Sequence, residues 1–389
     1  MNRRPRVLLL APGSSHALHA GVVSFARDVG WILDCRMSYT GQVPDGSDVD
    51  GMLCWRANRT DVTGFMRGLD VPVVGLDRSV DHTWPSVSCC DESIGRAAAR
   101  HLLARGHKAL AFCGPADAPR LVGFKAEAES AGARFVRLAP PEGASVLSSS
   151  EAIRDWMGPM LSSLRVPLAV MVAEDLEAAP VIDALVGLGY SVPEQVAVIG
   201  AGNDPMLCDV ARVPVSSVDV RAHEVGYAAA RLLDSLMAGS PPPSTPRRIE
   251  PGPVKVRAST DTVVLSNLHA ARALRFIWTR YRDPINVDSV SEHVPVTRRR
   301  LQTLFHEQLG RTMQEEIARV RIADACLMLK RSRMRIHRIA TLTGFKSSLH
   351  FHRTSQSVLG MGPKAFREAG TIPDFGVLPA RVGDQLSPE

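Results

Sequence analysis

Residues 336–353 read IHRIATLTGFKSSLHFHR, the pattern of two short helices joined by a tight turn. Gly344 supplies the turn, because glycine adopts left-handed backbone conformations without strain. Ser347 follows as the N-cap of the second helix, because a serine hydroxyl accepts a hydrogen bond from a free backbone N–H. Four apolar side chains fall at helical spacing and can pack between the helices: Ile336, Ile339, Ala340 and Phe351. The stretch predicts a helix-turn-helix unit over about residues 336–356.

A second unit of this kind precedes it, over about residues 287–306. A helical stretch from Val287 to Val294 ends at Pro295, and Thr297 is a suitable N-cap for the helix that follows. Three apolar side chains of that helix share one face and should point inward: Leu301, Leu304 and Phe305. Between the two units, Glu315 to Leu329 has the length and amphipathic pattern of a rigid helical spacer.

The outer faces of the two second helices carry groups that can read DNA. Arginine pairs with guanine and glutamine with adenine at base edges in the major groove. In the first unit these candidates are Thr297, Arg298, Arg299, Gln302 and Thr303, and in the second unit Ser347, Ser348, Leu349 and Arg353. The alternative is a solvated basic helix face with no partner. On the first interpretation, the spacer places both recognition helices on one side of a duplex, about one helical turn of ~34 Å apart.

Charge is distributed unevenly along the 389 residues, although the formal net charge is only +6. Residues 265–370 contain 19 Lys and Arg against 8 Asp and Glu, whereas residues 1–264 contain 26 against 29. A basic module attached to a nearly neutral one is expected when one part faces phosphates and the other part has a different role.

The segment from Leu304 to Arg367 resembles the AraC/XylR family of regulators. The resemblance rests on Phe305, Leu309-Gly310, Ile317, Arg321, Ala325, Met328-Leu329, Ile339-Ala340, Gly344-Phe345, Phe351, Gly360, Pro363 and Arg367. It implies two recognition helices in the major groove of an operator and control of transcription. Four positions depart from the family pattern, which usually has Phe at Ser355, Tyr at His350, Pro at Met313 and Thr or Ser at Gly362. Because a missing buried aromatic costs ~3–5 kcal/mol, we expect a weaker core in the second unit and more sequence specificity in the first.

Up to about residue 257, short β-branched runs alternate with amphipathic helical stretches. The expected strands are Val7–Leu10, Gly51–Cys54, Val71–Gly75, Ala109–Cys113, Leu168–Val172 and Val196–Ile199. The expected helices include Ala17–Val29, Ser93–Arg105, Glu177–Leu188 and Glu224–Met237. This rhythm predicts doubly wound α/β structure with parallel sheets that are buried on both faces.

These first 257 residues are similar to the two-lobed periplasmic-binding-protein fold of LacI-type and XylR-type regulators. The resembling segments are residues 71–77, 95–106, 111–114, 120–124, 192–200 and 216–218, followed by Gly226, Tyr227 and Ala229. The resemblance implies a small sugar, such as a pentose, held between the lobes and contacted by Arg120. Glu174 and Gly202 stand where the family usually has Asn and Asp, so we expect Asp175, Asn203 and Asp204 as alternative acceptors and leave the effector open. Ser14 and Ser15 are further candidates, either as ligand contacts or as a helix cap.

The predicted organisation is a sensor domain over residues 1–257, a linker over 258–266 and a DNA-binding domain over 267–370. Residues 371–389 lack periodicity and are predicted to be a disordered tail. The arginines at the start of the chain imitate a signal peptide, but Pro12 interrupts the apolar run after five residues, which favours a buried first strand. Seven scattered cysteines argue against a disulfide framework or a zinc site, so we expect a cytoplasmic, non-membrane protein.

The leading hypothesis is a ligand-gated regulator that binds a double-stranded DNA operator, forms a homodimer and could contact RNA polymerase. No catalytic residue, metal site or cofactor is expected, since no P-loop, HExxH or Ser/His/Asp pattern stands out. Two alternatives remain open. One is a DNA-repair type of enzyme carrying an AraC-type module, and the other is a ligand-independent DNA-binding protein.

Overall fold

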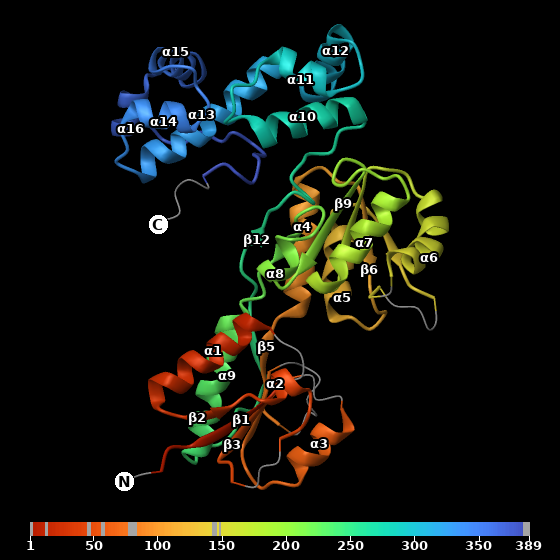
Figure 1. Ribbon diagram of the computed structural model, residues 1–389, viewed down its shortest axis with the longest axis vertical. Helices are drawn as coiled ribbons and strands as arrows, with labels where there is room; N and C mark the ends of the chain where they lie inside the picture. The colour runs from red at the N-terminus through yellow and green to blue at the C-terminus, as the bar shows by residue number, and fades with distance from the viewer. Residues whose placement is uncertain are drawn as a thin grey trace.

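The computed structural model describes residues 3–11, 15–44, 48–55, 59–76, 84–141, 146–147 and 149–383. Figure 1 shows three units in line: an α/β lobe that contains the N-terminus, a second α/β lobe, and a helical domain at the far end. We call these lobe 1, lobe 2 and the helical domain. Among the described residues, no helix has the length and apolarity that a bilayer-crossing segment needs.

Lobe 1 is built on a parallel sheet in the order β2-β1-β3-β4. Its strands are β1 (Arg6–Leu10), β2 (Ile32–Asp34), β3 (Gly51–Cys54) and β4 (Val73–Gly75). The parallel pair of β5 (Val87–Cys89) and β11 (Arg247–Ile249) is joined to β4 by a bridge between Gly75 and Ser86. The helices are α1 (His16–Val29), α2 (Met37–Thr40), α3 (Thr60–Arg67) and α9 (Ala222–Met237).

Two apolar layers hold lobe 1 together, one on each face of its sheet. On one face α1 and α9 bury Val22, Phe25 and Leu233 against the strands. On the other face Val62 and Met66 of α3 lie over Met52. The two long helices approach so closely that a Cβ on Gly21 would lie 2.0 Å from the carbonyl oxygen of His223, so only glycine fits there.

Lobe 2 is built on a six-stranded sheet in the order β12-β10-β9-β8-β6-β7, parallel except for β12. Its strands are β6 (Ala109–Cys113), β7 (Arg134–Leu138), β8 (Leu168–Val172), β9 (Val196–Ala201), β10 (Ser216–Val218) and β12 (Val254–Lys255). Helices α4 (Asp91–Ala104) and α5 (Pro119–Ser130) cover one face, and α6 (Ser150–Ser162) and α7 (Asp175–Gly187) the other. The short helix α8 (Pro205–Cys208) follows β9.

The chain passes between the lobes three times, from β5 to α4, from β10 to α9 and from β11 to β12. This connectivity confirms the two-lobed α/β architecture with parallel sheets. The strands that were expected as uninterrupted apolar runs are indeed covered on both faces; β8, for example, is buried at all five positions.

The helical domain contains α10 (Leu268–Arg280), α11 (Val287–His293), α12 (Arg298–Leu309), α13 (Met313–Arg331), α14 (Ile336–Leu342), α15 (Ser348–Leu359) and α16 (Pro363–Ala369). Helix α13 passes through the whole domain and contributes to two separate cores. Its first half packs with α10, α11 and α12 around Trp278 and Phe305. Its second half packs with α14, α15 and α16 around Phe351 and Phe366.

The linker is attached to lobe 2. Thr260 lies beside His101 of α4, with Oγ1 2.8 Å from Nε2 of the imidazole. The guanidinium of Arg105, directly after α4, donates to the carbonyl of Thr262 at 3.0 Å, and the Arg105 carbonyl accepts from the N–H of Val264 at 2.8 Å. Arg275 of α10 adds a direct contact between the domains, an ion pair with Glu194 of lobe 2 at 3.0 Å.

The prediction of a disordered tail is wrong for residues 371–383, which are packed along the helical domain. Val377 and Val382 join the core around α10 and α13. The backbone N–H of Gly383 donates to Asp324 at 2.9 Å, and that of Ala380 to Asp261 at 2.9 Å. Sequence patterns did not reveal this packing because the segment's partners are distant in the chain. Residues 384–389 lie outside the described part.

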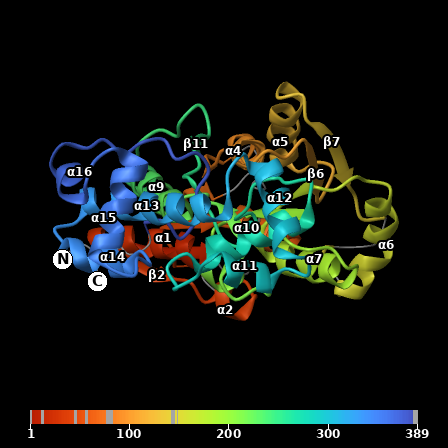
Figure 2. The same ribbon diagram turned by 90° about the horizontal axis from the view of Figure 1, so that it is seen from above.

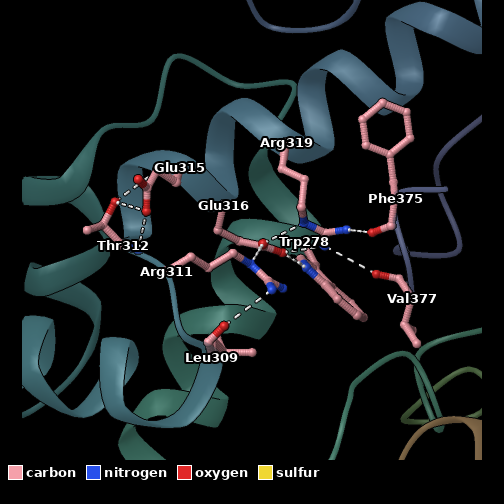
Figure 3. A network of polar contacts seen from close by, with 9 residues as sticks. All are labelled: Trp278, Leu309, Arg311, Thr312, Glu315, Glu316, Arg319, Phe375 and Val377. Atoms are coloured by element: carbon pink, nitrogen blue, oxygen red, sulfur yellow. Dashed lines mark hydrogen bonds and ion pairs between the residues drawn. The ribbon is translucent and has the colours of Figure 1, made fainter. Parts of the chain in front are cut away.

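Glu316 lies at the centre of the polar network that joins α13 to α10 and to the C-terminal segment (Figure 3). Its carboxylate is fully buried and accepts hydrogen bonds from Trp278 Nε1 at 2.7 Å, Arg311 Nε at 2.5 Å and Arg319 Nε at 2.7 Å. Arg319 also donates to the carbonyls of Phe375 and Val377. Burial alone would raise the pKa of Glu316, but the hydrogen bonds and charge of Arg319 outweigh it and hold the pKa below its ordinary value.

Candidate nucleic-acid interface and ligand cavity

The first helix-turn-helix unit consists of α11 and α12. Thr297 caps α12, with its hydroxyl oxygen accepting from the N–H of Arg300 at 3.4 Å. Leu301, Leu304 and Phe305 are buried, so the opposite face of the helix points outward. That face exposes all five of the residues that were expected there: Thr297, Arg298, Arg299, Gln302 and Thr303.

Not every exposed side chain of α12 is equally available. Arg298 forms an ion pair with Asp288 of α11, and the hydroxyl of Thr303 donates to the carbonyl of Arg299 at 3.2 Å. Arg300 is exposed beside them and was not singled out from the sequence. Arg299, Arg300 and Gln302 therefore remain available on this helix, and Arg299 and Gln302 are the two that the sequence had predicted as base contacts.

The second unit consists of α14 and α15. Gly344 makes the turn with a φ of +81°, and Ser347 caps α15 by accepting from the N–H of His350 at 3.1 Å. Ser347, Ser348, Leu349 and Arg353 are exposed, and Leu349 retains 60% of its accessible surface. An exposed leucine at the start of a recognition helix suits contact with a thymine methyl group.

Ser355 occupies the buried position at which the family usually has an aromatic residue. It has no exposed surface, and its hydroxyl donates to the carbonyl of Met361 at 2.8 Å, so its polarity is satisfied. Phe345 and Phe351 pack nearby with ring centroids 4.8 Å apart, and His350 lies edge-on to Phe345. The lower specificity expected of this unit stays a prediction.

Helices α12 and α15 lie on the same side of the helical domain, the side that faces away from the sensor (Figure 1). In Figure 2, viewed from that side, both lie in front of the lobes. They are separated by α13, whose 19 residues span about 28 Å at the rise of an α-helix. The length of this spacer helix is comparable to the ~34 Å between successive major grooves on one face of a duplex.

A cavity of about 350 Å³ lies between the two lobes. Lobe 1 contributes Ser15, Leu18, Trp55 and Leu76, and lobe 2 contributes Arg120, Ala173, Glu174 and Glu177. Residues at the ends of the elements beside the crossings complete the wall: Ser88, Cys89, Asp91, Val220 and Ala222. An adjoining cavity of about 250 Å³ shares Ser15, Trp55, Arg120, Glu174 and Val220 and extends toward Asp175 and Asp204. A small ligand could be enclosed here, because the carboxyl ends of strands, the N-termini of helices and the side chain of a tryptophan meet at this place.

Arg120 is the central basic group among the described residues of the cavity wall. Its Nε donates to Asp91 at 3.0 Å, and Nη1 donates to the carbonyl of Ala173. Burial alone would lower the pKa of Arg120, but the charge of Asp91 outweighs it and raises the pKa above its ordinary value. Burial raises the pKa of Glu177, whose carboxylate accepts from the N–H of Glu174, the N-cap of α7, at 3.3 Å and from that of Ala173 at 2.8 Å. The wall therefore holds its polar groups in fixed positions before any ligand arrives.

The structure brings some of the expected ligand contacts together and separates others. Ser15, Arg120, Glu174 and Asp204 line the cavities, although Ser15 also caps α1 and Asp204 caps α8. Asp175 lines only the adjoining cavity, and its Oδ2 accepts from the N–H of Asp204 at 3.1 Å.

Asn203 does not line either cavity, because its backbone turns through a φ of +55° and its side chain accepts from Arg257 at 3.0 Å. Ser14 lies outside the described residues. Sequence reasoning missed Trp55, Leu76 and Asp91. Trp55 directly follows a predicted strand, and that position could have indicated it.

Two domain models match the chain. The model described as "Periplasmic binding protein-like domain" covers residues 99–260, and the model described as "Helix-turn-helix domain" covers residues 290–369. The Xylose operon regulatory protein of Escherichia coli K12 is 26% identical over 317 residues, which is 78% of this chain and 80% of that protein. This chain is therefore similar, over most of its length, to an operon regulatory protein of the XylR type.

Another relative, the Xylose operon regulatory protein of Haemophilus influenzae, is 29% identical over 207 residues. That match covers 53% of this chain and spans about half of the relative's length, 54%. A solved structure described as the xylose-binding transcription activator XylR has the same fold, with a TM-score of 0.65 at 22% identity, and covers 94% of this chain and 98% of that chain. The chain thus combines a periplasmic-binding-protein-like domain with a helix-turn-helix domain, as expected from the sequence.

Proposed function

We propose that this regulator binds a double-stranded DNA operator by placing α12 and α15 in successive major grooves. The observation that carries the proposal is the placement of both capped helices on the outer side of one domain, separated by a helix of about 28 Å. Base reading falls to Arg299 and Gln302 of the first unit and to Ser348, Leu349 and Arg353 of the second. Thr297 and Ser347 cap their helices and favour contact with phosphates.

Replacement of Arg299 by alanine tests the assignment. An operator is first selected from random duplexes with the full chain, and its affinity is then measured by mobility shift. Removal of a bidentate hydrogen bond to a base should weaken specific binding by about 1–3 kcal/mol and relax the preference at one position. The matched control is Arg231→Ala, which removes an exposed arginine of lobe 1. Equal operator affinity of the two variants would contradict the proposed contact.

The cavity between the lobes is the proposed site for a small sugar-like effector. Its size, the Trp55 side chain in its wall and the fixed Arg120 support a hydroxylated ligand, and the relatives' names make pentoses the first compounds to test. A thermal-shift screen of pentoses and related polyols should reveal the effector, because a ligand that binds only the folded sensor stabilises it. Arg120→Ala should abolish the shift, whereas Arg165→Ala, at an exposed site of lobe 2, should leave it intact.

We further infer that the regulator acts as a homodimer in the cytoplasm, where the chromosome is, and that RNA polymerase is its partner if it activates transcription. The relatives are regulators of transcription, which favours this role over that of an enzyme. Among the described residues, no group of three His, Cys, Asp or Glu side chains could hold a metal ion. The ligand-independent alternative predicts no thermal shift with any sugar.

A further inference from the structure

Acidic residues are distributed very unevenly between the two helix-turn-helix units. Residues 281–324, which include the first unit, contain seven Lys and Arg and seven Asp and Glu. Residues 325–367, which include the second unit, contain nine Lys and Arg and not one Asp or Glu. We call this second stretch the acid-free segment. The positive charge of the helical domain is therefore concentrated on one of its two reading units.

In the first unit, the cations are largely neutralised within the domain. Arg298 pairs with Asp288, Arg311 and Arg319 pair with Glu316, and Arg282 pairs with Asp324. Arg321 is buried and donates to the carbonyl of Tyr281 at 2.7 Å. These side chains stabilise the fold, and because their charges are largely neutralised they attract an external anion only weakly.

The acid-free segment is different. Two of its cations are used structurally: Lys330 donates to the carbonyl of Arg367 at 3.1 Å, and Arg367 donates to the carbonyl of Met334 at 2.5 Å. The other seven are exposed, and within the described ranges no hydrogen bond or ion pair joins their side chains to another group. We call them the cation cluster: Arg331, Arg333, Arg335, Arg338, Lys346, Arg353 and Lys364.

The cation cluster lies on α15 and on the elements that surround it. Arg331 ends α13, and Arg333 lies in the connection that follows. Arg335 is the N-cap of α14, Arg338 lies in the first turn of that helix, and Lys364 lies on α16. Both α14 and α16 pack against α15, which carries Arg353 (Figure 2). When a recognition helix enters a major groove, the elements on either side of it meet the two phosphate strands that border the groove.

We propose that the second helix-turn-helix unit is the electrostatic anchor of this regulator and holds DNA phosphates with Arg333, Arg335 and Arg338. The inference rests on the proposed DNA binding and adds a division of roles between the units. Seven unpaired like charges repel one another and destabilise the free domain. Phosphates remove that repulsion, and the release of their counterions drives binding without regard to sequence.

The test compares the full chain with a triple variant, R333Q/R335Q/R338Q. Its matched control, R165Q/R212Q/R231Q, removes three exposed arginines of the sensor lobes. Fluorescence anisotropy measures affinity for a mixed-sequence duplex of about 30 base pairs, long enough for both units. No operator is needed, because phosphate contacts carry no sequence information. Circular dichroism checks that the variants are folded, and Arg338→Gln alone provides a smaller perturbation.

The triple variant should flatten the slope of log affinity against log salt by about 0.9 for each phosphate that it no longer neutralises, up to about 2.7. At about 0.15 M salt, this corresponds to roughly fivefold weaker binding for each such phosphate. The control variant should retain the slope of the wild type. Identical slopes for the triple and control variants would overturn the proposal.

Two further outcomes separate the possible failures. If the triple variant retains DNA affinity but loses activation of a reporter promoter, the cluster binds another protein and the phosphate assignment is wrong. If the wild type itself shows no salt-dependent binding to duplex DNA, the proposed function fails together with this inference. If the affinity of the wild type falls steeply with salt and the triple variant shows the same slope, the proposed function stands and the proposed division of roles is wrong.

Discussion

Replacement of Glu316 by glutamine should destabilise the helical domain and leave the sensor unchanged. The carboxylate has no exposed surface and accepts from Trp278, Arg311 and Arg319 (Figure 3). The amide keeps the shape of the side chain but removes the negative charge between two guanidinium groups. Its NH₂ group also faces donors where an acceptor is needed.

The magnitude follows from the burial of the charges. Removal of one partner from a buried ion pair costs about 3–5 kcal/mol, because the remaining charge is left without compensation. The matched control is Glu315→Gln, one residue earlier. Glu315 is exposed and accepts from the N–H of Thr312 at 2.7 Å in a capping box, a position at which glutamine also works. We expect that control to cost less than about 0.5 kcal/mol.

Native-state hydrogen exchange, followed by mass spectrometry, measures the two variants in the full chain. Peptides from α10 and α13 should open more easily in Glu316→Gln by about 3–5 kcal/mol, while peptides from β8 and α7 should keep their protection and provide an internal reference. A difference of less than about 1 kcal/mol between the two variants in α10 and α13 would refute the reasoning. The carboxylate would then not be the charge that holds this junction together.

Three further predictions concern other parts of the chain. Gly344→Ala should cost the second unit about 1–3 kcal/mol in a thermal melt, because φ is +81° and the added Cβ would lie 2.4 Å from the carbonyl oxygen of Tyr281; an unchanged melt would contradict this. A chain ending at Gly370 should melt earlier in its helical domain only, since it lacks Val377 and Val382 in the core, and an unaltered transition would show that the segment is dispensable. Burial lowers the pKa of His101 from 6.5 to about 3, so folding favours the neutral imidazole. The attachment of the linker should therefore lose stability as the pH falls below about 6.5. His101→Gln should flatten that dependence in melts recorded across this range, and a variant with the same slope as the wild type would exclude His101 as its cause.

The sequence predicted the regular elements well where apolar periodicity marks them. Strands Gly51–Cys54, Ala109–Cys113 and Leu168–Val172 lie as expected. Helices begin earlier than expected at Asp91 and Asp175. Their first turns are acidic, which suits a helix N-terminus electrostatically but leaves no apolar pattern to detect.

The exposed side chains of α12 and α15 could be predicted because both units are local. Each recognition helix has its cap, its buried face and its exposed face within about 20 residues, so periodicity alone orients Gln302 and Arg353. Long-range contacts were not accessible in the same way. The packing of residues 371–383 depends on donation by Arg319 to backbone carbonyls, and any sequence offers such carbonyls.

The residues of the cavity between the lobes could be predicted only in part. Arg120 and Glu174 were located through the resemblance to known sensors, and both line the cavity. Asn203 was misplaced because a single residue with positive φ turns its side chain toward Arg257. Asp91 was missed because its role depends on a partner 29 residues away in sequence, Arg120.

The attachment of the helical domain to lobe 2 has a mechanical consequence. Both anchoring contacts, the linker beside Arg105 and the pair of Arg275 with Glu194, are made by lobe 2. A hinge rotation between the lobes therefore moves lobe 1 while the DNA-binding helices keep their place on lobe 2. Within a single subunit, such a rotation leaves the position of these helices relative to lobe 2, and hence to bound DNA, unchanged. If lobe 1 were held against a second subunit, the same rotation would instead move lobe 2 and would displace the helical domain at its far end.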